Sequence, residues 1–198
     1  MIDYEYGVKF DTIPEVMLEV LRTWRNDPKI YNWCRQVGLI EQANQKKWFD
    51  KIQEDQSIQM FSVLGKAVSG DEEVETLLGV AGLCSINTIH GHAEISLYLY
   101  PDLKYKKGER QLLFKPAPSS SLAAIKTLAR YAFDDLRLNR IWGDTFEENR
   151  VEVLNLSTLG FVCEGTLRES YFKQGKFINS VIQSMLRSDY KKVKESWK

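Results

Sequence analysis

Few residues in this sequence stand close enough together along the chain to form a metal-binding or proton-transfer pair. His90 and His92 stand two positions apart around Gly91, a spacing that could bind a metal or move a proton. No cysteine or cluster of carboxylates accompanies them in the turn, which favours a solvated hairpin turn over a ligand pair. We therefore expect no metal site.

The three cysteines indicate a reducing compartment. Cys34, Cys84 and Cys163 are odd in number, lie far apart and form no CxxC motif, so no disulfide framework is expected. Cys84 falls in the middle of an expected strand, where a free cysteine behaves as a small hydrophobic residue rather than a nucleophile. The first residues lack the basic and apolar regions of a signal peptide. No apolar run approaches the roughly 20 residues of a membrane span. We expect a cytoplasmic protein with no membrane partner.

The charge balance argues against a polyanion as the general partner. Lysine plus arginine and aspartate plus glutamate number 27 each, and 43% of the 198 residues are hydrophobic. A chain of this length and composition suits one α/β domain with a substantial core. We thus expect no nucleic-acid partner, because any attraction to nucleic acid would depend on a local patch. The basic run Lys104–Arg110 is the candidate patch, and its plainer interpretation is a solvated loop.

Hydrophobic periodicity predicts an alternation of strands and helices in the first half. Polar and apolar residues alternate in the strand segments, whereas Val16, Leu21 and Trp24 recur at helical spacing after Pro14. The expected order is a strand, two helices and a three-strand antiparallel meander, at residues 3–10, 14–26, 40–52, 59–66, 77–87 and 93–100.

The second half is expected to begin with a long loop, residues 101–121, which is basic at first and then rich in proline and serine. Ser121 is a suitable N-cap for the helix that follows. The buried stripe of this helix consists of Leu122, Ile125, Leu128, Ala129, Ala132 and Phe133. A strand, a short helix and a final hairpin follow at 140–146, 149–158 and 160–186. No internal repeat or domain boundary interrupts residues 1–198, which predicts a single domain.

Four stretches in this order carry a resemblance to a known family. They are Ala93–Leu97 (AEISL), residues 131–141 (YAFDDLRLNRI), Glu148-Asn149 followed by Leu159-Gly160-Phe161, and residues 164–186. With this spacing, the sequence from about Ala81 onward resembles the GNAT superfamily of acyl-CoA N-acyltransferases. The resemblance is to the branch of ribosomal-protein N-terminal and amino-sugar N-acetyltransferases. Trp24–Pro28 is similar, more loosely, to the amino-sugar members.

The resemblance implies a fold of the α/β (α+β) class, the GNAT fold, in which helices cover both faces of a mixed, mainly antiparallel seven-stranded sheet. Residues 93–100 and 140–146 would form a parallel pair that diverges, because a helix connects them. The thioester of acetyl-CoA, the co-substrate, would lie between these two strands. Backbone groups at Tyr98 and Leu99 would face it, and Asn149 would contact it.

One segment departs from the family pattern. In the family the phosphate-binding loop has the sequence pattern Arg/Gln-x-x-Gly-x-Gly/Ala. The corresponding stretch here is 116–121, which contains no glycine. The helix start still presents amides to a pyrophosphate, and the hydroxyls of Ser119, Ser120 and Ser121 add donors. Lys106, Lys107 and Arg110 could compensate with charge. The alternative is a loop that no longer binds coenzyme A.

The catalytic assignments implied by the resemblance are two. Glu94 would be the general base that takes the proton of the attacking amine; the alternative is an ion pair with a neighbouring lysine or arginine. Residues 153–157 contain no tyrosine to protonate the leaving thiolate, so solvent or Ser157 would do so. Tyr98, Tyr100 and Tyr105 could line an acceptor pocket, although strands favour tyrosine anyway.

The expected function is transfer of an acetyl group from acetyl-CoA to a primary amine of a small molecule, first among them an amino sugar, often nucleotide-linked. One alternative is acetylation of a protein N-terminus. Another is a GNAT-fold module that has lost catalysis and binds a partner or polyanion through 104–115. The acceptor, the acyl chain length and the choice between monomer and homodimer are not identified by the sequence.

Overall fold

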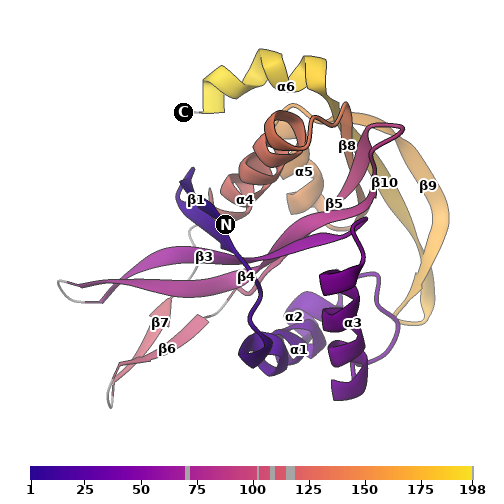
Figure 1. Cartoon of the computed structure of the whole chain (residues 1–198). Coiled ribbons are helices and arrows are strands. Elements are labelled where there is room, and N and C mark those ends of the chain that lie inside the picture. The colour runs from indigo at the N-terminus through magenta and orange to yellow at the C-terminus, as the bar shows by residue number, and fades with distance from the viewer. Residues whose placement is uncertain (70–71, 102, 108–109, 115–118, 198) are drawn as a thin grey trace.

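A computed structural model gives the arrangement of the chain (Figure 1). It describes the backbone of residues 1–69, 72–101, 103–107, 110–114 and 119–197, and the side chains of these residues outside 3–5, 67–74 and 102–119. The strands are β1 (Ile2–Glu5), β2 (Val8–Asp11), β3 (Gln59–Ser69), β4 (Glu72–Asn87), β5 (His92–Leu99), β6 (Leu103–Lys107), β7 (Arg110–Phe114), β8 (Arg140–Phe146), β9 (Val162–Lys173) and β10 (Lys176–Leu186). The α-helices are α1 (Leu18–Asn26), α2 (Pro28–Tyr31), α3 (Gln42–Glu54), α4 (Ser119–Arg130), α5 (Arg150–Thr158) and α6 (Arg187–Val193). Short 3₁₀ turns precede α1 at Glu15–Met17 and follow α6 at Lys194–Trp197, and a π-helical turn at Tyr131–Asp135 ends α4. None of the described helices is long and apolar enough to cross a bilayer.

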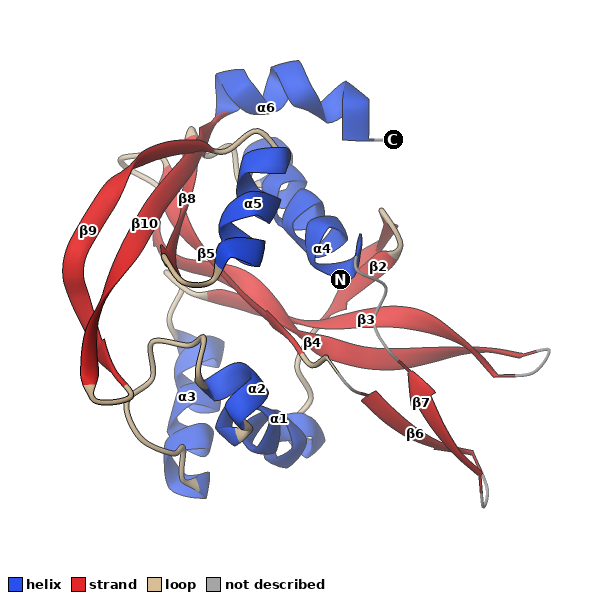
Figure 2. Ribbon diagram, turned by 180° about the vertical axis from the view of Figure 1, so that it is seen from behind, coloured by secondary structure: helices blue, strands red, loops and turns tan. Residues whose placement is uncertain are grey.

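The main sheet is mixed and mainly antiparallel, with helices on both faces, as the sequence predicts (Figure 2). Within the described residues it contains eight strands in the order β1-β2-β3-β4-β5-β8-β10-β9. The extra strand arises because the expected first strand, residues 3–10, is a hairpin of β1 and β2. Tyr6 and Gly7 adopt positive φ angles of 53° and 94° between them, a left-handed conformation that glycine adopts at no steric cost.

The parallel pair occurs where it was expected. β5 and β8 pair through His92–Arg140, Ala93–Ile141 and Glu94–Trp142, and the ladder ends there. The connection between them contains α4, whose Ala124, Ile125 and Leu128 are fully buried against the sheet. A helical crossover of this kind places the two strands parallel. Beyond Glu94 the strands separate, and the separation opens the sheet between two layers of helices.

Each face of the sheet carries its own group of helices. Figure 2 shows α4 and α5 on one face and α1, α2 and α3 on the other. The first group covers the larger core, which includes Leu83, Phe133 and Ile141. The second covers a smaller cluster centred on Leu21 and Val80. The opening between β5 and β8 therefore has helices on both sides.

The segment expected to be a long loop contains a hairpin. β6 and β7 pair antiparallel from Leu103–Phe114 to Lys107–Arg110 and extend away from the main sheet (Figure 1). The prediction of an irregular 101–121 loop was wrong for these ten residues. α4 begins at Ser119, three residues before the helix start at Leu122 that an N-cap at Ser121 predicts. The glycine-free stretch 116–118 lies outside the described residues.

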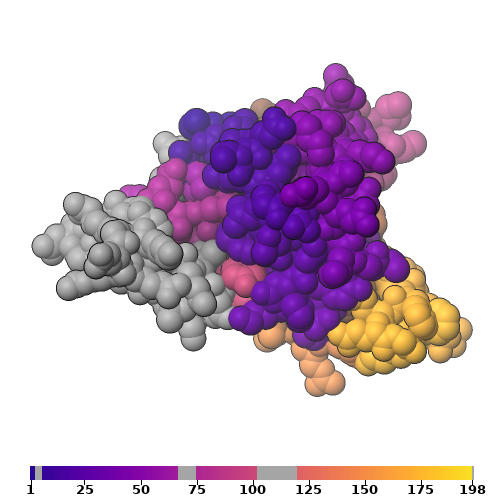
Figure 3. Space-filling view, turned by 90° about the horizontal axis from the view of Figure 1, so that it is seen from below, coloured from indigo at the N-terminus to yellow at the C-terminus, as the bar shows by residue number. Residues whose placement is uncertain are grey.

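The last elements close the far edge of the sheet. β9 and β10 form the expected hairpin around Gly175, whose φ is 79°. The hairpin end lies next to the layer of α1–α3, as Figure 3 shows by its yellow-orange atoms. The helical C-terminal segment was not expected. Trp197 in it is 5% exposed and packs edge-on against Tyr6, so this segment packs onto the core.

Candidate active site

A cleft begins where β5 and β8 separate. It comprises two adjoining cavities of about 240 and 250 Å³. Residues that line both cavities come from the loop after α2, from β5 and from α5: Trp33, Cys34, Leu97, Tyr98, Asn149 and Glu152. The first cavity also reaches Asp144–Phe146 of β8 and Arg25 of α1, and the second reaches Leu99 and Ser121 at the start of α4. The cleft thus joins the α4 side of the sheet to the α1–α3 side.

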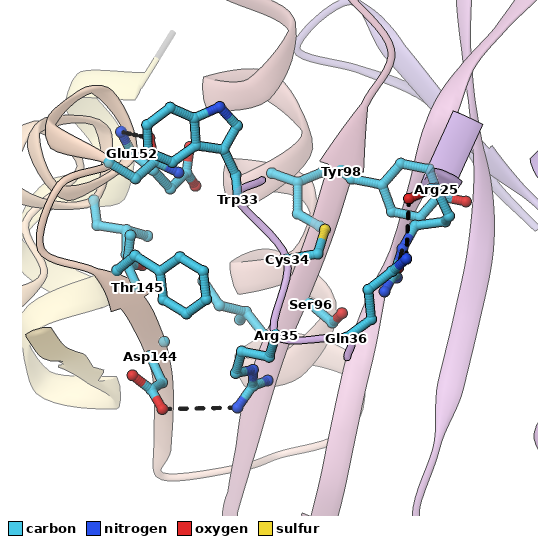
Figure 4. Close-up of a pocket in the computed structure, with 16 residues that line it drawn as sticks. Arg25, Trp33, Cys34, Arg35, Gln36, Ser96, Tyr98, Asp144, Thr145 and Glu152 are labelled. Atoms are coloured by element: carbon cyan, nitrogen blue, oxygen red, sulfur yellow. Dashed lines mark hydrogen bonds and ion pairs between the residues drawn. The ribbon is translucent and has the colours of Figure 1, made fainter. Parts of the chain in front are cut away.

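The loop of residues 32–41, here called the acceptor loop, forms one wall of the first cavity (Figure 4). Arg25 Nε donates to Gln36 Oε1 at 2.8 Å, and Gln36 Nε2 donates back to the Arg25 carbonyl at 3.2 Å. Lys173 Nζ donates to the Gln36 carbonyl at 2.8 Å and lies 3.5 Å from the centre of the Tyr31 ring. The loop is therefore fixed from α1 on one side and from the β9–β10 hairpin on the other.

Four side chains form a polar network at the narrow end of the cleft. Arg35 of the acceptor loop forms an ion pair with Glu94 and lies 3.7 Å from Asp144 Oδ2. Tyr171 of β9 donates to the same Asp144 oxygen at 2.5 Å. The other oxygen, Asp144 Oδ1, is buried and has no partner among the described residues. The Asp144 side chain is only 6% exposed and belongs to the wall of the first cavity.

Glu94 belongs to the last residue pair of the parallel ladder between β5 and β8. It is 7% exposed, and burial raises the pKa of its carboxyl, while the Arg35 charge acts in the opposite direction. The alternative reading of this residue, an ion pair with a neighbouring basic residue, is therefore present in the structure. Glu94 lies beside the cleft rather than among the residues that line it. Its role as general base stays a prediction.

The residues expected to hold the donor lie on the other side of the cleft. Tyr98 and Leu99 line it, as does Asn149, whose side chain also caps α5 by accepting from the Glu152 N–H at 3.4 Å. Ser121 lines the second cavity, whereas Ser120 is buried. Ser119 begins α4, and its side chain lies outside the described residues. The same holds for the charged side chains of 104–110.

Ser157 does not reach the cleft. Its hydroxyl donates to the Val153 carbonyl at 3.0 Å and accepts from Gln183 Nε2 at 2.9 Å, so it faces β10. The cleft side of α5 carries Asn149, Glu152 and Leu156 instead. Their spacing of three and four residues is the signal that could have identified Glu152 from the sequence once Asn149 was placed.

Glu152 is the carboxyl at the junction of the two cavities. Burial raises the pKa of this group. Asn155 Nδ2 lies 3.4 Å from its Oε2 and 3.0 Å from Ser121 Oγ, so one amide connects α5 to the first turn of α4. No basic side chain forms an ion pair with Glu152 within the described part of the chain.

The histidines and cysteines give no further catalytic candidate in the cleft. His90 and His92 stack with ring centres 6.4 Å apart, and the described residues contain no group of three metal-ligating side chains. All three cysteines are free thiols. Cys34 lines the cleft, but burial raises the pKa of its thiol, which lowers the fraction present as the nucleophilic thiolate.

Comparison with curated proteins finds N-acetyltransferases. No protein-family model matches the chain. It is 23% identical over 175 residues to an uncharacterized N-acetyltransferase, p20, of Bacillus licheniformis, covering 87% of this chain and 88% of the relative. It is 26% identical over 142 residues to spermidine N(1)-acetyltransferase of Vibrio cholerae, covering 72% and 75%. It is also 26% identical over 133 residues to the acetyltransferase PseH of Campylobacter jejuni, covering 67% and 69%.

Solved structures share the fold over nearly the whole chain. Spermidine N-acetyltransferase from Vibrio cholerae, solved in complex with CoA and spermine, matches with a TM-score of 0.73 at 21% identity and covers 94% of this chain and 99% of its own. An acetyltransferase structure from T. thermophilus matches with a TM-score of 0.70 at 21% identity, covering 99% and 94%. Together with the diverging parallel pair, these matches show the GNAT fold, and with the acetyltransferases among the relatives in sequence they support an acyl-CoA N-acyltransferase.

Proposed function

We propose that this N-acetyltransferase moves an acetyl group from acetyl-CoA to the primary amine of a small molecule, and that the acceptor is an amino sugar or a related amine rich in hydroxyl or anionic groups. The observation that carries this proposal is the separation of β5 and β8 after Glu94 and Trp142. The separation leaves a strand edge facing a cleft that connects the start of α4 with the acceptor loop.

The donor side of the cleft fits acetyl-CoA. After Glu94, no strand among the described residues pairs with β5 on the β8 side, and the pantetheine arm would bind along this open strand edge at Tyr98 and Leu99. α4 starts beside the second cavity with Ser121 in its wall. A helix start presents unpaired N–H groups and the positive end of the helix dipole, which suit a pyrophosphate. Asn149 adds an amide at the junction of the two cavities.

The acceptor side supplies two carboxyl groups. An ammonium group that enters the first cavity meets the carboxyl of Asp144 in its wall. Glu94 then takes a proton from the amine, directly or through water, because only a neutral amine is a nucleophile. The amine nitrogen attacks the thioester carbonyl carbon, and backbone N–H groups of β5 stabilise the oxyanion that forms. The carbon–sulfur bond breaks and gives the acetamide and coenzyme A.

The charges of the first cavity favour a hydroxylated or anionic amine over a polycation. Arg25 and Arg35 line it together with the carboxyl groups of Asp144 and Glu152. A polyamine with several ammonium groups gains little from a wall that contains two guanidinium groups, whereas a sugar hydroxyl or nucleotide phosphate can accept from them. The curated relative named for spermidine makes a polyamine the second candidate.

A protein N-terminus is a weaker candidate. A peptide needs a groove through which its chain can leave the site. Here Lys173 and Tyr171 connect the β9–β10 hairpin to the acceptor loop at Gln36 and Arg35, two residues that line the first cavity. A cavity of about 240 Å³ accommodates a small acceptor more readily than an extended chain.

Two measurements test the proposal. Calorimetric titration with acetyl-CoA should show binding, and release of free thiol should follow addition of an amine. The panel is glucosamine, a nucleotide-linked amino sugar, spermidine and a peptide with a free N-terminus. We expect the sugar amines to give the largest kcat/KM. Preference for spermidine would select the second candidate, and no thiol release with any amine would favour a binding module. Chromatographic mass determination separates a monomer from a homodimer.

A further inference from the structure

On the side of α5 that faces the cleft, the candidate proton donor is a carboxyl group and not a hydroxyl group. Ser157 faces β10, and Leu156 has no proton to give. Glu152 is the residue of this helix that combines an ionisable proton with a place in both cavities. In Figure 4 it lies on the other side of the view from Tyr98.

The position of Glu152 is fixed from two sides. Its backbone N–H is bound by the Asn149 side chain at the helix start. Its carboxyl lies within 3.4 Å of Asn155 Nδ2, and the same amide nitrogen donates to Ser121 Oγ on α4. The carboxyl is therefore oriented by the two helices that flank the donor side of the cleft, and no cation among the described side chains engages it.

The protonation state of Glu152 suits an acid. The pKa of the carboxyl is raised because the group is largely removed from water, with only the weak contact to Asn155 acting in the other direction. A larger fraction therefore keeps its proton near neutral pH than for an exposed glutamate. The ionised form of a buried carboxyl without a cationic partner is unfavourable in free energy. Glu152 can therefore give its proton to a bound group only transiently and takes up another proton afterwards.

We propose that Glu152 is the general acid of the reaction and protonates the sulfur of coenzyme A as it leaves. The inference rests on the proposed function. In the tetrahedral intermediate the carbon–sulfur bond breaks, its electron pair goes to sulfur, and the Glu152 proton forms the S–H bond of coenzyme A. The proton of the amine goes to Glu94 or to water. Solvent returns one proton to Glu152 as Glu94 or water releases one, so each turnover converts an amine and acetyl-CoA into an acetamide and free thiol.

The decisive variant is Glu152→Gln, which keeps the size of the side chain and removes the transferable proton. We expect kcat with acetyl-CoA to fall about 10²-fold, the lower end of the range for general acid–base groups, while the calorimetric affinity for acetyl-CoA stays unchanged. Glu148→Gln is the matched control, because Glu148 lies four residues earlier, just before α5, is exposed and contacts Lys176 at the surface. It should keep the kcat of the native chain.

The leaving group and pH distinguish an acid from a merely structural residue. 4-Nitrophenyl acetate releases a phenolate that needs no proton, so Glu152→Gln should use it nearly as well as the native chain does. With acetyl-CoA, the kcat of the native chain should fall as pH rises through the pKa of Glu152, and the variant should lack this alkaline limb.

Four results would overturn the inference. An equal loss of rate with both donors, with the alkaline limb retained, would assign Glu152 a structural role. A raised KM for the amine with unchanged kcat would make it part of the acceptor site. Equal rates for the native chain and the Gln variant would remove Glu152 from the reaction and leave the proposed function intact. Absence of thiol release from the native chain would overturn both.

Discussion

Arg35 and Glu94 form an ion pair that joins the acceptor loop to the strand at the narrow end of the cleft. The two residues are 59 positions apart in the chain, and the contact places a fixed positive charge on the carboxyl proposed as the base. Asp144 lies on the other side of the same guanidinium group at 3.7 Å. Whatever enters the first cavity therefore meets an arginine held between two carboxyls.

Replacement of Glu94 tests the base directly. Glu94→Gln should lower kcat by about 10²–10⁴-fold, because the amide cannot accept the proton of the amine. The affinity for acetyl-CoA should change little, since Glu94 lies outside the donor side of the cleft. Steady-state kinetics at saturating amine, with calorimetry, provide the measurement. Glu54→Gln, an exposed change at the end of α3, is the control. An unchanged kcat would transfer the role to Asp144 or to a water chain.

Arg35 should set the acidic limb of the pH profile. Burial raises the pKa of Glu94 and the Arg35 charge lowers it. A base works when deprotonated, so kcat/KM rises with pH through the pKa of Glu94. Arg35→Gln removes the opposing charge, and the limb should move to higher pH by about one unit or more. Arg168→Gln on the exposed face of β9 should leave it in place. If the limb does not move, Glu94 is not the group whose titration produces it.

The contacts of Lys173 with the acceptor loop should affect binding of the amine acceptor and not binding of acetyl-CoA. Lys173→Met removes the hydrogen bond to the Gln36 carbonyl and the contact with the Tyr31 ring. The free energy of unfolding should fall by about 1–3 kcal/mol, and KM for the amine should rise. Acetyl-CoA affinity should be retained. Lys176→Met on the same hairpin removes an exposed pair with Glu148 and should cost less than about 1 kcal/mol.

The start of α4 should tolerate no added negative charge if it binds a pyrophosphate. Ser120 is buried, so the test belongs at Ser121, which lines the second cavity. Ser121→Asp should weaken acetyl-CoA binding strongly, and more so at low salt, because repulsion between charges is screened by ions. Ser188→Asp, in the first turn of α6 and away from the cleft, should bind normally. Equal binding by both variants would place the phosphates elsewhere.

The raised pKa of Glu152 has a consequence for stability. A carboxyl whose pKa is higher in the folded than in the unfolded chain stabilises the fold below the unfolded pKa, near its ordinary value of 4.5, and this contribution is lost as pH rises through the folded pKa. Glu152→Gln should therefore melt at a higher temperature than the native chain at pH 8 and at a similar temperature at pH 4. Thermal unfolding across this range is the measurement. A less stable variant at pH 8 would contradict the raised pKa.

The parts of the fold that follow from local pattern were predictable. The strand–helix–strand order around α4 requires a parallel pair, and Asn149 before an apolar helix predicts its cap. The β6–β7 hairpin was missed because the high charge of 104–110 weakens the signal from the alternation of Leu103 and Tyr105 with lysines. α6 was missed because its short amphipathic pattern follows a strand without a strong turn signal.

The site was only partly predictable, because its polar groups come from distant segments. Arg35, Asp144 and Tyr171 belong to a loop and two strands that no local periodicity connects. Ser157 was chosen by its place in the helix sequence, but the side of a helix that faces a cleft depends on how the helix packs. Gln183 binds the Ser157 hydroxyl from β10, a contact that only the folded sheet creates.

The bond between Lys173 and Gln36 joins residues 137 positions apart, and it makes acceptor choice a property of two segments at once. An exchange of the acceptor loop alone between members of the superfamily would leave Lys173 facing a carbonyl that is no longer in place. The loop and the β9–β10 hairpin therefore form one exchangeable unit, despite more than a hundred intervening residues. The donor side, built from β5, α4 and α5, can stay constant while that unit is replaced.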